Sequence, residues 1–150
     1  ICTNPPMCYI SIRPERHSYS IIKRNMEFVI NLTTAEMAFP TDWCGVRSGK
    51  EYHKFEEMKL TPGKCTVVNA PLIEESPLCI ECRVKEIVSL GSHDMFIADV
   101  VNVRADENHL NPETGKLELA EANPLVYVHG GYYELGSKIG KFGWSVEKKK

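Results

Sequence analysis

Residues 78–90, LCIECRVKEIVSL, and residues 93–105, HDMFIADVVNVRA, decide the fold class of this chain. In the first stretch apolar and polar residues alternate at many positions, with Glu81 and Arg83 on the more polar face. This alternation predicts a long, half-buried strand, and the second stretch has the same character. Gly91-Ser92 breaks the pattern between them. The sequence therefore predicts an antiparallel hairpin of two long strands.

The remaining predicted elements are short. Strand-forming residues occupy residues 7–13, 27–32 and 125–128. Apolar residues at helical spacing or helix-start signals occupy residues 17–25, 33–39 and 52–58. The alternation of strand and helix that marks a doubly wound sheet is absent after residue 60. We expect one mainly β domain over residues 1–150, a barrel or sandwich with small helices added.

The second of these helices, over residues 33–39, has explicit boundary signals. Thr33 and Glu36 stand at the spacing of a capping box, which predicts Thr33 as the N-cap residue. Pro40 is expected to end or kink this helix, because proline lacks the backbone donor that a helix interior needs. Residues 43–50, which contain two glycines, are expected to form a loop.

Composition and charge exclude several classes of protein. The chain has 18 basic and 20 acidic residues, so no strong positive field exists to hold nucleic acid or an anionic membrane. The lysine run 148–150 is expected to be a solvated tail. No apolar run is long enough for a transmembrane helix, and no secretory signal is visible. Six cysteines without an export signal predict reduced thiols and a cytoplasmic protein.

The common catalytic and metal-binding signatures are absent. No Gly-rich dinucleotide motif follows a strand, and residues 45–50, GVRSGK, are one residue short of a phosphate-binding loop. The pair Cys79 and Cys82 is a single C-x-x-C, whereas zinc ribbons need two. Cysteines three apart on a strand point to opposite faces, so we expect both to be packing residues. The five histidines are not paired at metal-ligand spacing, and no metal site is predicted.

Two segments have the chemistry of anion binding. The first runs from Arg13 to Ser20 and combines two arginines and several hydroxyl groups with the start of a predicted helix, whose N–H groups favour phosphate. The second is Ser48-Gly49-Lys50, followed by His53 and Lys54. From the residues alone, two interpretations stay open: a phosphate site, or an ordinary helix start and a charged loop.

The order of several short motifs resembles one known family. These motifs are CTNPPM at 2–7, SIRP at 11–14, RHSY at 16–19, EFVINLT at 27–33, CG at 44–45, SGK at 48–50, LGSHDMF at 90–96 and GKFG at 140–143. Each motif is weak, but their number and order over nearly the whole chain are specific. The chain resembles the flavin reductase-like FMN-binding split barrels, and most closely their flavoredoxin branch.

The resemblance implies a six-stranded antiparallel Greek-key split barrel with short helices and a homodimer with one FMN per subunit near its interface. It also implies an upstream segment that supplies the first strands, so we expect the chain to lack part of the domain. The implied cofactor is FMN, with FAD as the alternative. The positions that match the family's cofactor segments are Thr3, Asn4, Pro5, Arg13, Arg16, His17, Ser18, Tyr19, Asn31, Leu32, Thr33, Cys44, Ser48, Gly49, Lys50 and Lys54.

His93 is the one catalytic candidate that the resemblance implies. Many members carry Gly-Asp-His here, a segment linked to nicotinamide and flavin binding, whereas this chain has Gly91-Ser92-His93 with Asp94 after the histidine. Three functions are consistent with the resemblance. The first is an NAD(P)H-dependent flavin or ferric reductase, the second an FMN electron carrier supplied by a protein partner, and the third a non-enzymatic ligand-binding barrel.

Overall fold

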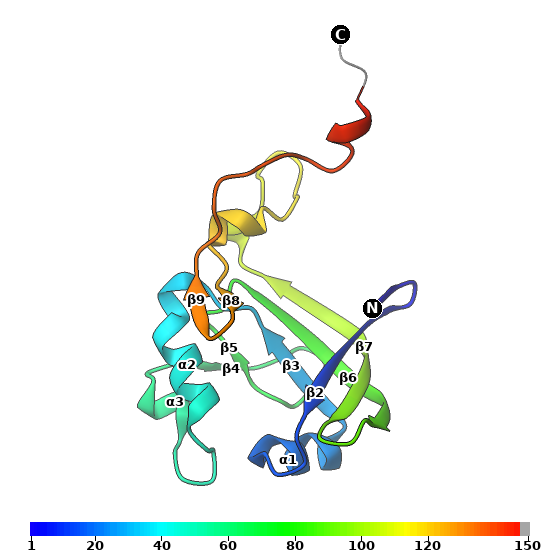
Figure 1. Ribbon diagram of the computed structural model, residues 1–150, viewed down its shortest axis with the longest axis vertical. Coiled ribbons are helices and arrows are strands. Elements are labelled where there is room, and N and C mark those ends of the chain that lie inside the picture. The colour runs from blue at the N-terminus through cyan, green and yellow to red at the C-terminus, as the bar shows by residue number, and fades with distance from the viewer. Residues whose placement is uncertain (148–150) are drawn as a thin grey trace.

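Two long antiparallel strands, β6 (Leu78–Ser89) and β7 (Asp94–Ala105), form the centre of the computed structural model, which describes residues 1–147 (Figure 1). They pair along almost their whole length, from Leu78 opposite Ala105 to Ser89 opposite Asp94. The turn between them holds Gly91 at φ +97°, a conformation that favours glycine. The predicted hairpin is therefore confirmed.

Three shorter strands extend this hairpin into an antiparallel sheet of order β1-β2-β7-β6-β3. They are β1 (Cys2–Thr3), β2 (Pro6–Ile12) and β3 (Glu27–Asn31). Two small hairpins form hydrogen-bonded sheets of their own: β4 (Pro62–Gly63) with β5 (Leu72–Ile73), and β8 (Val126–Val128) with β9 (Gly131–Tyr133). The mainly β prediction is confirmed, and within residues 1–147 the main sheet has five strands where the implied barrel has six.

Helix α1 (His17–Asn25) has the predicted bounds and covers one end of the sheet (Figure 1). It ends at Met26, whose left-handed conformation lets its N–H donate to the carbonyl of Ile22 at 2.7 Å. Tyr19 and Ile22 on this helix pack against a buried cluster. That cluster consists of Phe28, Cys82, Val84, Phe96 and Ala98. The main core thus lies between α1 and the inner face of the sheet.

The helix predicted over residues 33–39 is wrong in its position. A short turn, η1 (Ala35–Met37), leads directly into α2 (Ala38–Val46), and Thr33 is not the N-cap residue. Pro40 lies in the first turn of α2, where a backbone N–H has no partner within the helix, so proline is tolerated there. Residues 43–46, predicted as a loop, therefore continue this helix.

The other short helices are α3 (Lys54–Glu57), η2 (Glu107–His109), η3 (Leu119–Ala122) and η4 (Trp144–Val146). Helix α3 is shorter than the helix predicted over residues 52–58. None of the helices within residues 1–147 is long and apolar enough to cross a membrane. The lysine run 148–150 lies outside the described residues.

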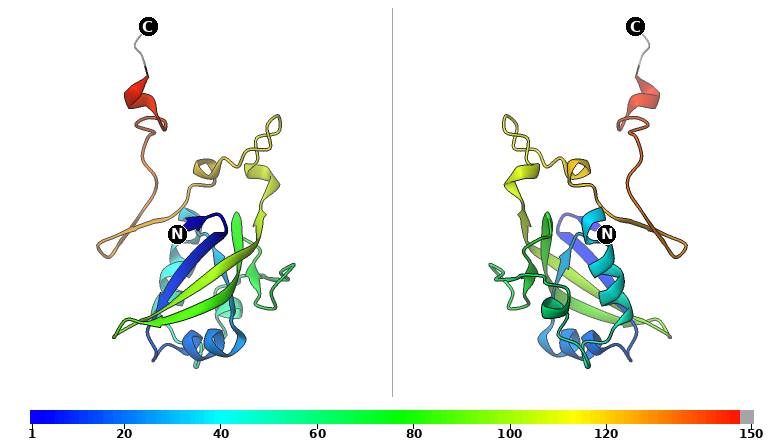
Figure 2. Two further views of the ribbon diagram at one scale, coloured as in Figure 1. Left: turned by 90° about the vertical axis from the view of Figure 1, so that its right-hand side faces the viewer. Right: turned by 90° about the vertical axis from the view of Figure 1, so that its left-hand side faces the viewer.

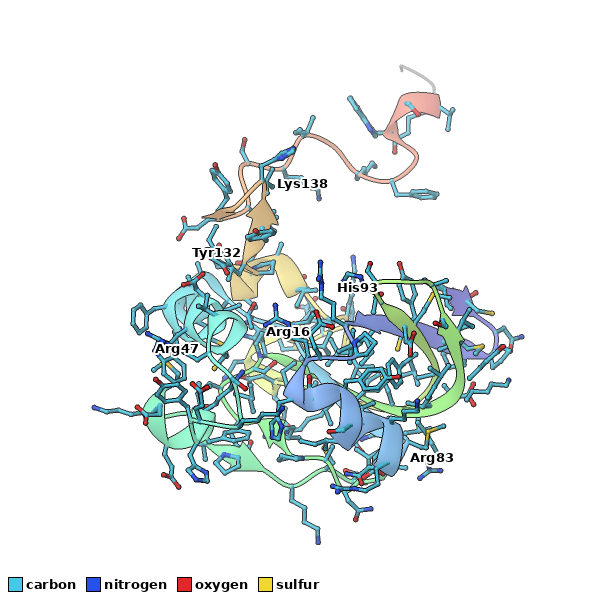
Figure 3. The ribbon with its side chains drawn as sticks, turned by 60° about the horizontal axis from the view of Figure 1, so that its bottom comes forward. Arg16, Arg47, Arg83, His93, Tyr132 and Lys138 are labelled. Atoms are coloured by element: carbon cyan, nitrogen blue, oxygen red, sulfur yellow. The ribbon has the colours of Figure 1, made fainter. Side chains whose placement is uncertain are left out.

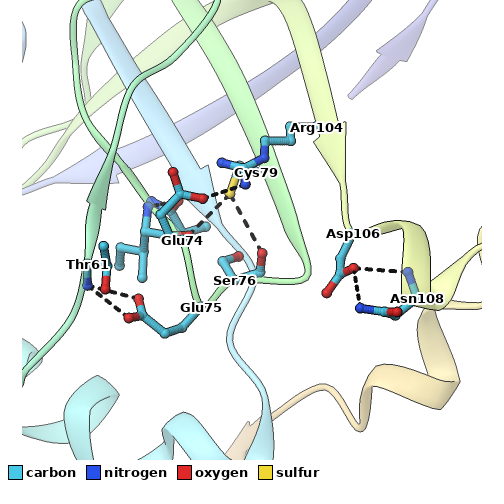
Figure 4. Close-up of polar contacts among 10 residues, drawn as sticks. Thr61, Glu74, Glu75, Ser76, Cys79, Arg104, Asp106 and Asn108 are labelled. Carbon is cyan, nitrogen blue, oxygen red and sulfur yellow. Dashed lines mark hydrogen bonds and ion pairs between the residues drawn. The ribbon is translucent and has the colours of Figure 1, made fainter.

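A second buried cluster lies on the opposite face of β6, under the segment that joins β4 to β5. It consists of Cys65, Val68, Leu72 and Cys79. Polar contacts hold the residues next to β4 and β5 in place (Figure 4): Thr61 donates its N–H to Glu75, and Arg104 pairs with Glu74. Cys79 belongs to this cluster and Cys82 to the main core, so the two packing cysteines point to opposite faces as predicted. All six cysteines are free thiols.

After β9 the chain leaves the rest of the molecule. Figure 2 shows the segment that follows β9 as an extended arm that projects beyond the sheet and the helices. All residues from Tyr132 to Phe142 are exposed. The arm therefore contributes nothing to either core.

Candidate functional site

A cavity of about 880 Å³ opens where the start of α1 faces the end of α2 and the loop that follows it. Helix α1 places its first turn there, because Arg13-Pro14 ends the β2 region and the chain turns directly into the helix. Its lining residues are Arg13, Glu15, Arg16, His17, Ser18, Ile21, Cys44, Gly45, Arg47, Ser48, Gly49 and Lys54.

The cavity is strongly cationic. Arg13, Arg16, Arg47 and Lys54 line it, against the single carboxylate of Glu15. Arg13 pairs with Glu15 at 3.4 Å, but both side chains are solvated, so this pair neutralises little. Helix α1 has no side-chain cap, and its first-turn N–H groups add partial positive charge. The site therefore has the electrostatics of an anion-binding site.

The loop after α2 is held against the start of α1. Lys54 donates to the carbonyl of Cys44 at 2.5 Å, and the Ser48 hydroxyl accepts from the N–H of Lys50 at 3.2 Å. Gly49 lies close to α1: a Cβ at this position would be 2.8 Å from Cδ2 of His17, so the His17 ring would have to shift to admit one. The two predicted anion-binding segments thus form one site from opposite sides.

Lys54 and Cys44 also affect each other electrostatically. Burial raises the pKa of the Cys44 thiol, while the nearby Lys54 ammonium opposes this shift. The net direction is upward, so the thiol stays protonated near neutral pH. The Cys44 thiol is therefore uncharged and does not repel an anion in the cavity.

Eight of the predicted cofactor residues line this cavity: Arg13, Arg16, His17, Ser18, Cys44, Ser48, Gly49 and Lys54. The prediction missed Arg47, whose guanidinium lies 5.6 Å from the ring centre of Tyr52. Figure 3 shows Arg16 at the start of α1 and Arg47 after α2. The signal was present, because Arg47 sits between two matched motifs and repeats the charge of Arg13 and Arg16.

The other predicted positions lie outside this lining, and several have side chains or backbone groups in structural hydrogen bonds. Tyr19 donates to Asp94 at 2.6 Å, and Asn31 accepts from the N–H of Ile73 at 2.9 Å. Leu32 donates its N–H to Leu78, Thr33 accepts from the N–H of Leu125, and Lys50 is an exposed loop residue. Thr3, Asn4 and Pro5 are exposed at the β1–β2 turn.

His93 stands just before β7, at the far end of the hairpin turn. Its Nδ1 is 2.9 Å from the hydroxyl of Ser92. His93 is only partly exposed, and it is absent from the lining of the cationic cavity. His93 is therefore not one of the residues that form the wall of this cavity.

The donor set fits FMN at its phosphate end. A dianionic phosphate needs N–H, hydroxyl or cationic partners, and the cavity offers the α1 start, Ser18 and the arginines. The lining holds one carboxylate, that of Glu15. Within residues 1–147 no cluster of three or more His, Cys, Asp or Glu could hold a metal ion. The arrangement thus supports the binding of an anion.

Two solved structures similar to this chain are named flavoredoxins. The flavoredoxin of Desulfovibrio vulgaris (Miyazaki F) is 26% identical, with a TM-score of 0.90, and the match covers 98% of this chain and 79% of that one. The flavoredoxin from Methanosarcina acetivorans is also 26% identical, with a TM-score of 0.85 over 98% of this chain and 80% of that one. The split-barrel fold is therefore confirmed.

Sequence relatives point the same way. A protein of Archaeoglobus fulgidus is 31% identical over 100 residues, which is 67% of this chain and 56% of that protein. The FMN reductase (NADH) RutF of Serratia proteamaculans is 22% identical over 110 residues, 73% of this chain and 61% of that protein. The chain spans about half the length of the first curated relatives it matches. The flavin reductase like domain matches residues 1–136, and this chain belongs to that family.

Proposed function

We propose that this chain binds FMN and works as an NAD(P)H-dependent flavin or ferric reductase. The observation that carries the proposal is the cationic cavity at the uncapped start of α1. FMN combines a phosphate dianion with a flat, partly apolar ring, so it needs such a site for one end. FAD would place the same phosphate chemistry there, and it remains the alternative cofactor.

Three groups of residues would hold the phosphate. The N–H groups of the first turn of α1 and the Ser18 hydroxyl would donate to it directly. Arg13 and Arg16 would supply guanidinium forks from the same side. Arg47 and Lys54 would balance the second negative charge from the opposite wall.

Bound FMN would supply hydride and electron transfer through N5 of its ring, and the chain would supply binding and access. Thr3, Asn4, Pro5, Asn31 and Leu32 remain the proposed neighbours of the ring and ribityl chain. His93 is proposed to position a nicotinamide or the flavin, and His93→Ala is expected to slow reduction while the fold is kept.

A second candidate function is an electron carrier reduced by a protein partner. The observation that favours it is that two solved structures at 26% identity are flavoredoxins. The relatives named FMN reductase (NADH) favour the enzyme. The remaining parts of the proposal are a single domain over residues 1–150, a homodimer and a cytoplasmic location, the last supported by six free thiols.

Titration with FMN and with riboflavin tests the cavity, because riboflavin lacks the phosphate. We expect the wild type to bind FMN more tightly than riboflavin by about 100-fold, given about 1.5–3 kcal/mol for each hydrogen bond to a charged group. Arg16→Gln and Ser18→Ala should each weaken FMN binding by about 1–3 kcal/mol and leave riboflavin binding unchanged. Arg83→Gln is the matched control, because Arg83 is an exposed arginine on β6 (Figure 3).

Equal affinity for the two flavins would refute the phosphate site. A protein that refuses both would leave the third hypothesis, a barrel with another ligand. With FMN bound, loss of the flavin absorbance on addition of NADH or NADPH would identify a reductase. No loss with either nucleotide, together with reduction by a protein donor, would identify the carrier.

A further inference from the structure

Asp94 carries a buried carboxylate that the proposed function does not use. The residue is 9% exposed and is the first residue of β7. Its side chain accepts a hydrogen bond of 2.6 Å from the hydroxyl group of Tyr19, which is 75 positions away in the sequence. Carboxylates are almost never buried unless they are paired or hydrogen-bonded. The contact with Tyr19 therefore accounts for the place of Asp94 in the fold.

Lys23 fixes the direction of this hydrogen bond. Its ammonium group donates to the same Tyr19 hydroxyl at 3.2 Å and lies 5.3 Å from the centre of the Tyr19 ring. Because an ammonium group can only donate, the hydroxyl hydrogen of Tyr19 is directed to Asp94. The Tyr19 ring also packs edge-on against Phe96, with 5.6 Å between the ring centres. Tyr19 is thus held by its ring and by its hydroxyl group.

The backbone of Asp94 holds a second segment of the chain. Asp94 pairs with Ile12, the last residue of β2, and with Ser89, the last residue of β6. Ile12 packs against the main core, and Arg13 of the cationic cavity follows it directly. Three strands therefore meet at Asp94, at the end of the sheet that α1 covers (Figure 1).

We propose that Asp94 is the positioning residue of the phosphate site. The segment 13–18 supplies one wall of the cavity; it begins directly after Ile12 and ends directly before Tyr19. Asp94 holds both flanking residues, Ile12 through the backbone and Tyr19 through the side chain. It therefore fixes the two ends of this segment relative to each other without lining the cavity itself. The inference rests on the proposed phosphate site and adds the residue that shapes it.

The first turn of α1 needs such an anchor, because the helix has no side-chain cap. Arg16, the N-cap residue, makes no capping hydrogen bond, and the first turn contains no acidic residue. The N–H groups that would bind phosphate are the ones that an uncapped first turn leaves without partners. A turn tied to the sheet through Tyr19 presents these groups in a fixed direction, whereas a fraying turn must first be ordered by the ligand.

The ratio of the dissociation constants for riboflavin and FMN tests this role, because riboflavin lacks the phosphate. Flavin fluorescence titrations of the full chain give both constants. We expect Tyr19→Phe, which keeps the ring and removes the hydroxyl group, to reduce the ratio about fivefold through weaker FMN binding alone. Asp94→Ala should have an effect of the same size, because it removes the acceptor of the same hydrogen bond. The double variant should lose no more than either single variant, since the two side chains act as one unit.

Tyr9→Phe is the matched control. Tyr9 lies on β2 and is 49% exposed, whereas its neighbours Cys8 and Ile10 pack against the main core. Because successive side chains of a strand point to opposite faces, the Tyr9 hydroxyl is on the other side of the sheet from this core. The ratio should stay within about twofold of the wild-type value, as for an ordinary surface substitution.

Two kinds of result would overturn the proposal, and they differ in what they say about the phosphate site. If the wild type prefers FMN but Tyr19→Phe leaves the ratio unchanged or weakens both flavins equally, the contact is only structural and the phosphate site stands. Additive losses in the double variant would have the same meaning. If the wild type binds both flavins equally, the phosphate site itself is wrong and Asp94 has nothing to position. Urea unfolding of each variant without flavin establishes that folded protein is titrated.

Discussion

Glu81 is a buried carboxylate that holds the segment between β4 and β5 on the sheet, and its neutralisation is the most informative perturbation of this fold. The side chain is 1% exposed. One oxygen accepts from Asn102 and from the N–H of Thr66 at 2.8 and 3.0 Å. The other accepts from the N–H groups of Val67 and Val68 at 2.7 and 3.1 Å. Burial raises the pKa of Glu81, but these four hydrogen bonds outweigh it and lower the pKa to about 2.

Glu81→Gln keeps the shape of the side chain and replaces one oxygen by an NH₂ group. Asn102 and the N–H of Thr66 donate to the same oxygen of Glu81. If the NH₂ group of glutamine takes the place of this oxygen, the Asn102 amide can turn and accept from it, but the N–H of Thr66 has no acceptor left. The lost acceptor costs about 1 kcal/mol, the low end of the range for an unsatisfied donor, because Thr66 is exposed. The bonds from Val67 and Val68 lose their charge assistance, at about 1 kcal/mol each. We expect the free energy of unfolding to fall by about 3 kcal/mol.

The lowered pKa of Glu81 expresses the effect of the same hydrogen bonds as a dependence of stability on pH. A fall from the ordinary value of 4.5 to about 2 corresponds to about 3 kcal/mol of stabilisation of the charged form. Because the folded pKa lies below the unfolded one, this stabilisation is complete well above pH 4.5 and is lost as the pH falls toward 2. In that window the wild type should lose up to about 1.4 kcal/mol per pH unit more than the variant.

Urea unfolding without added flavin measures both effects, because bound ligand would contribute its own stabilisation. Glu86→Gln is the matched control, since Glu86 is exposed on the same strand, and its effect should stay within about 0.5 kcal/mol. The reasoning fails if the two variants lose equal stability at pH 7. It also fails if the difference between wild type and Glu81→Gln is the same at pH 7 and at pH 3.5.

Three further predictions concern the packing around α1. Gly49→Ala should weaken FMN binding, because the new Cβ would lie 2.8 Å from the His17 ring. In a His17→Ala background the loss of FMN affinity should be smaller, and a double-mutant cycle of FMN affinities would measure the difference. The hydrogen bond from the Tyr19 hydroxyl is the largest cause that lowers the pKa of Asp94. Tyr19→Phe removes this bond and should therefore raise the pKa of Asp94, which NMR titration of the carboxyl would detect. Burial raises the pKa of Cys82, so iodoacetamide should leave Cys82 unmodified in the folded protein at pH 8 and modify it in urea, as read by mass spectrometry.

Alternation along the chain predicts the strands of this fold but not which faces are covered. It places β6 and β7 correctly, because the side-chain period of a strand is a property of the backbone. It also puts Glu81 with Arg83 on the more polar face, yet Arg83 is exposed and Glu81 is buried. The pairing of β6 with β7 shifts register between Glu81 and Cys82, and the segment between β4 and β5 covers only the part of the face before this shift. Which part of a strand face is buried by a distant segment cannot be read from the alternation of apolar and polar residues along that strand.

Local rules also fail where they describe only the interior of an element. Pro40 was expected to end or kink a helix, and it lies in the first turn of α2 without breaking it. Thr33 was expected to cap, but its carbonyl accepts from the N–H of Leu125 instead. The first error comes from applying an interior rule to the first turn of a helix. The second comes from a contact with a distant segment, which the local spacing of Thr33 and Glu36 does not show. The sequence also did not predict the extended arm after β9, because exposed apolar residues look the same as core residues in a sequence.

The candidate site combines what the sequence could predict with what it could not. Arg13, Arg16 and Ser18 were predictable because they are neighbours along the start of one helix, where anion chemistry is local. That Arg47 completes the same cavity depends on α2 running to Val46, which the sequence did not predict. The end of α2 thus supplies one wall of the cationic cavity. A substitution that shortened α2 should therefore weaken FMN binding, because Cys44, Gly45 and Arg47 would no longer be held opposite the start of α1.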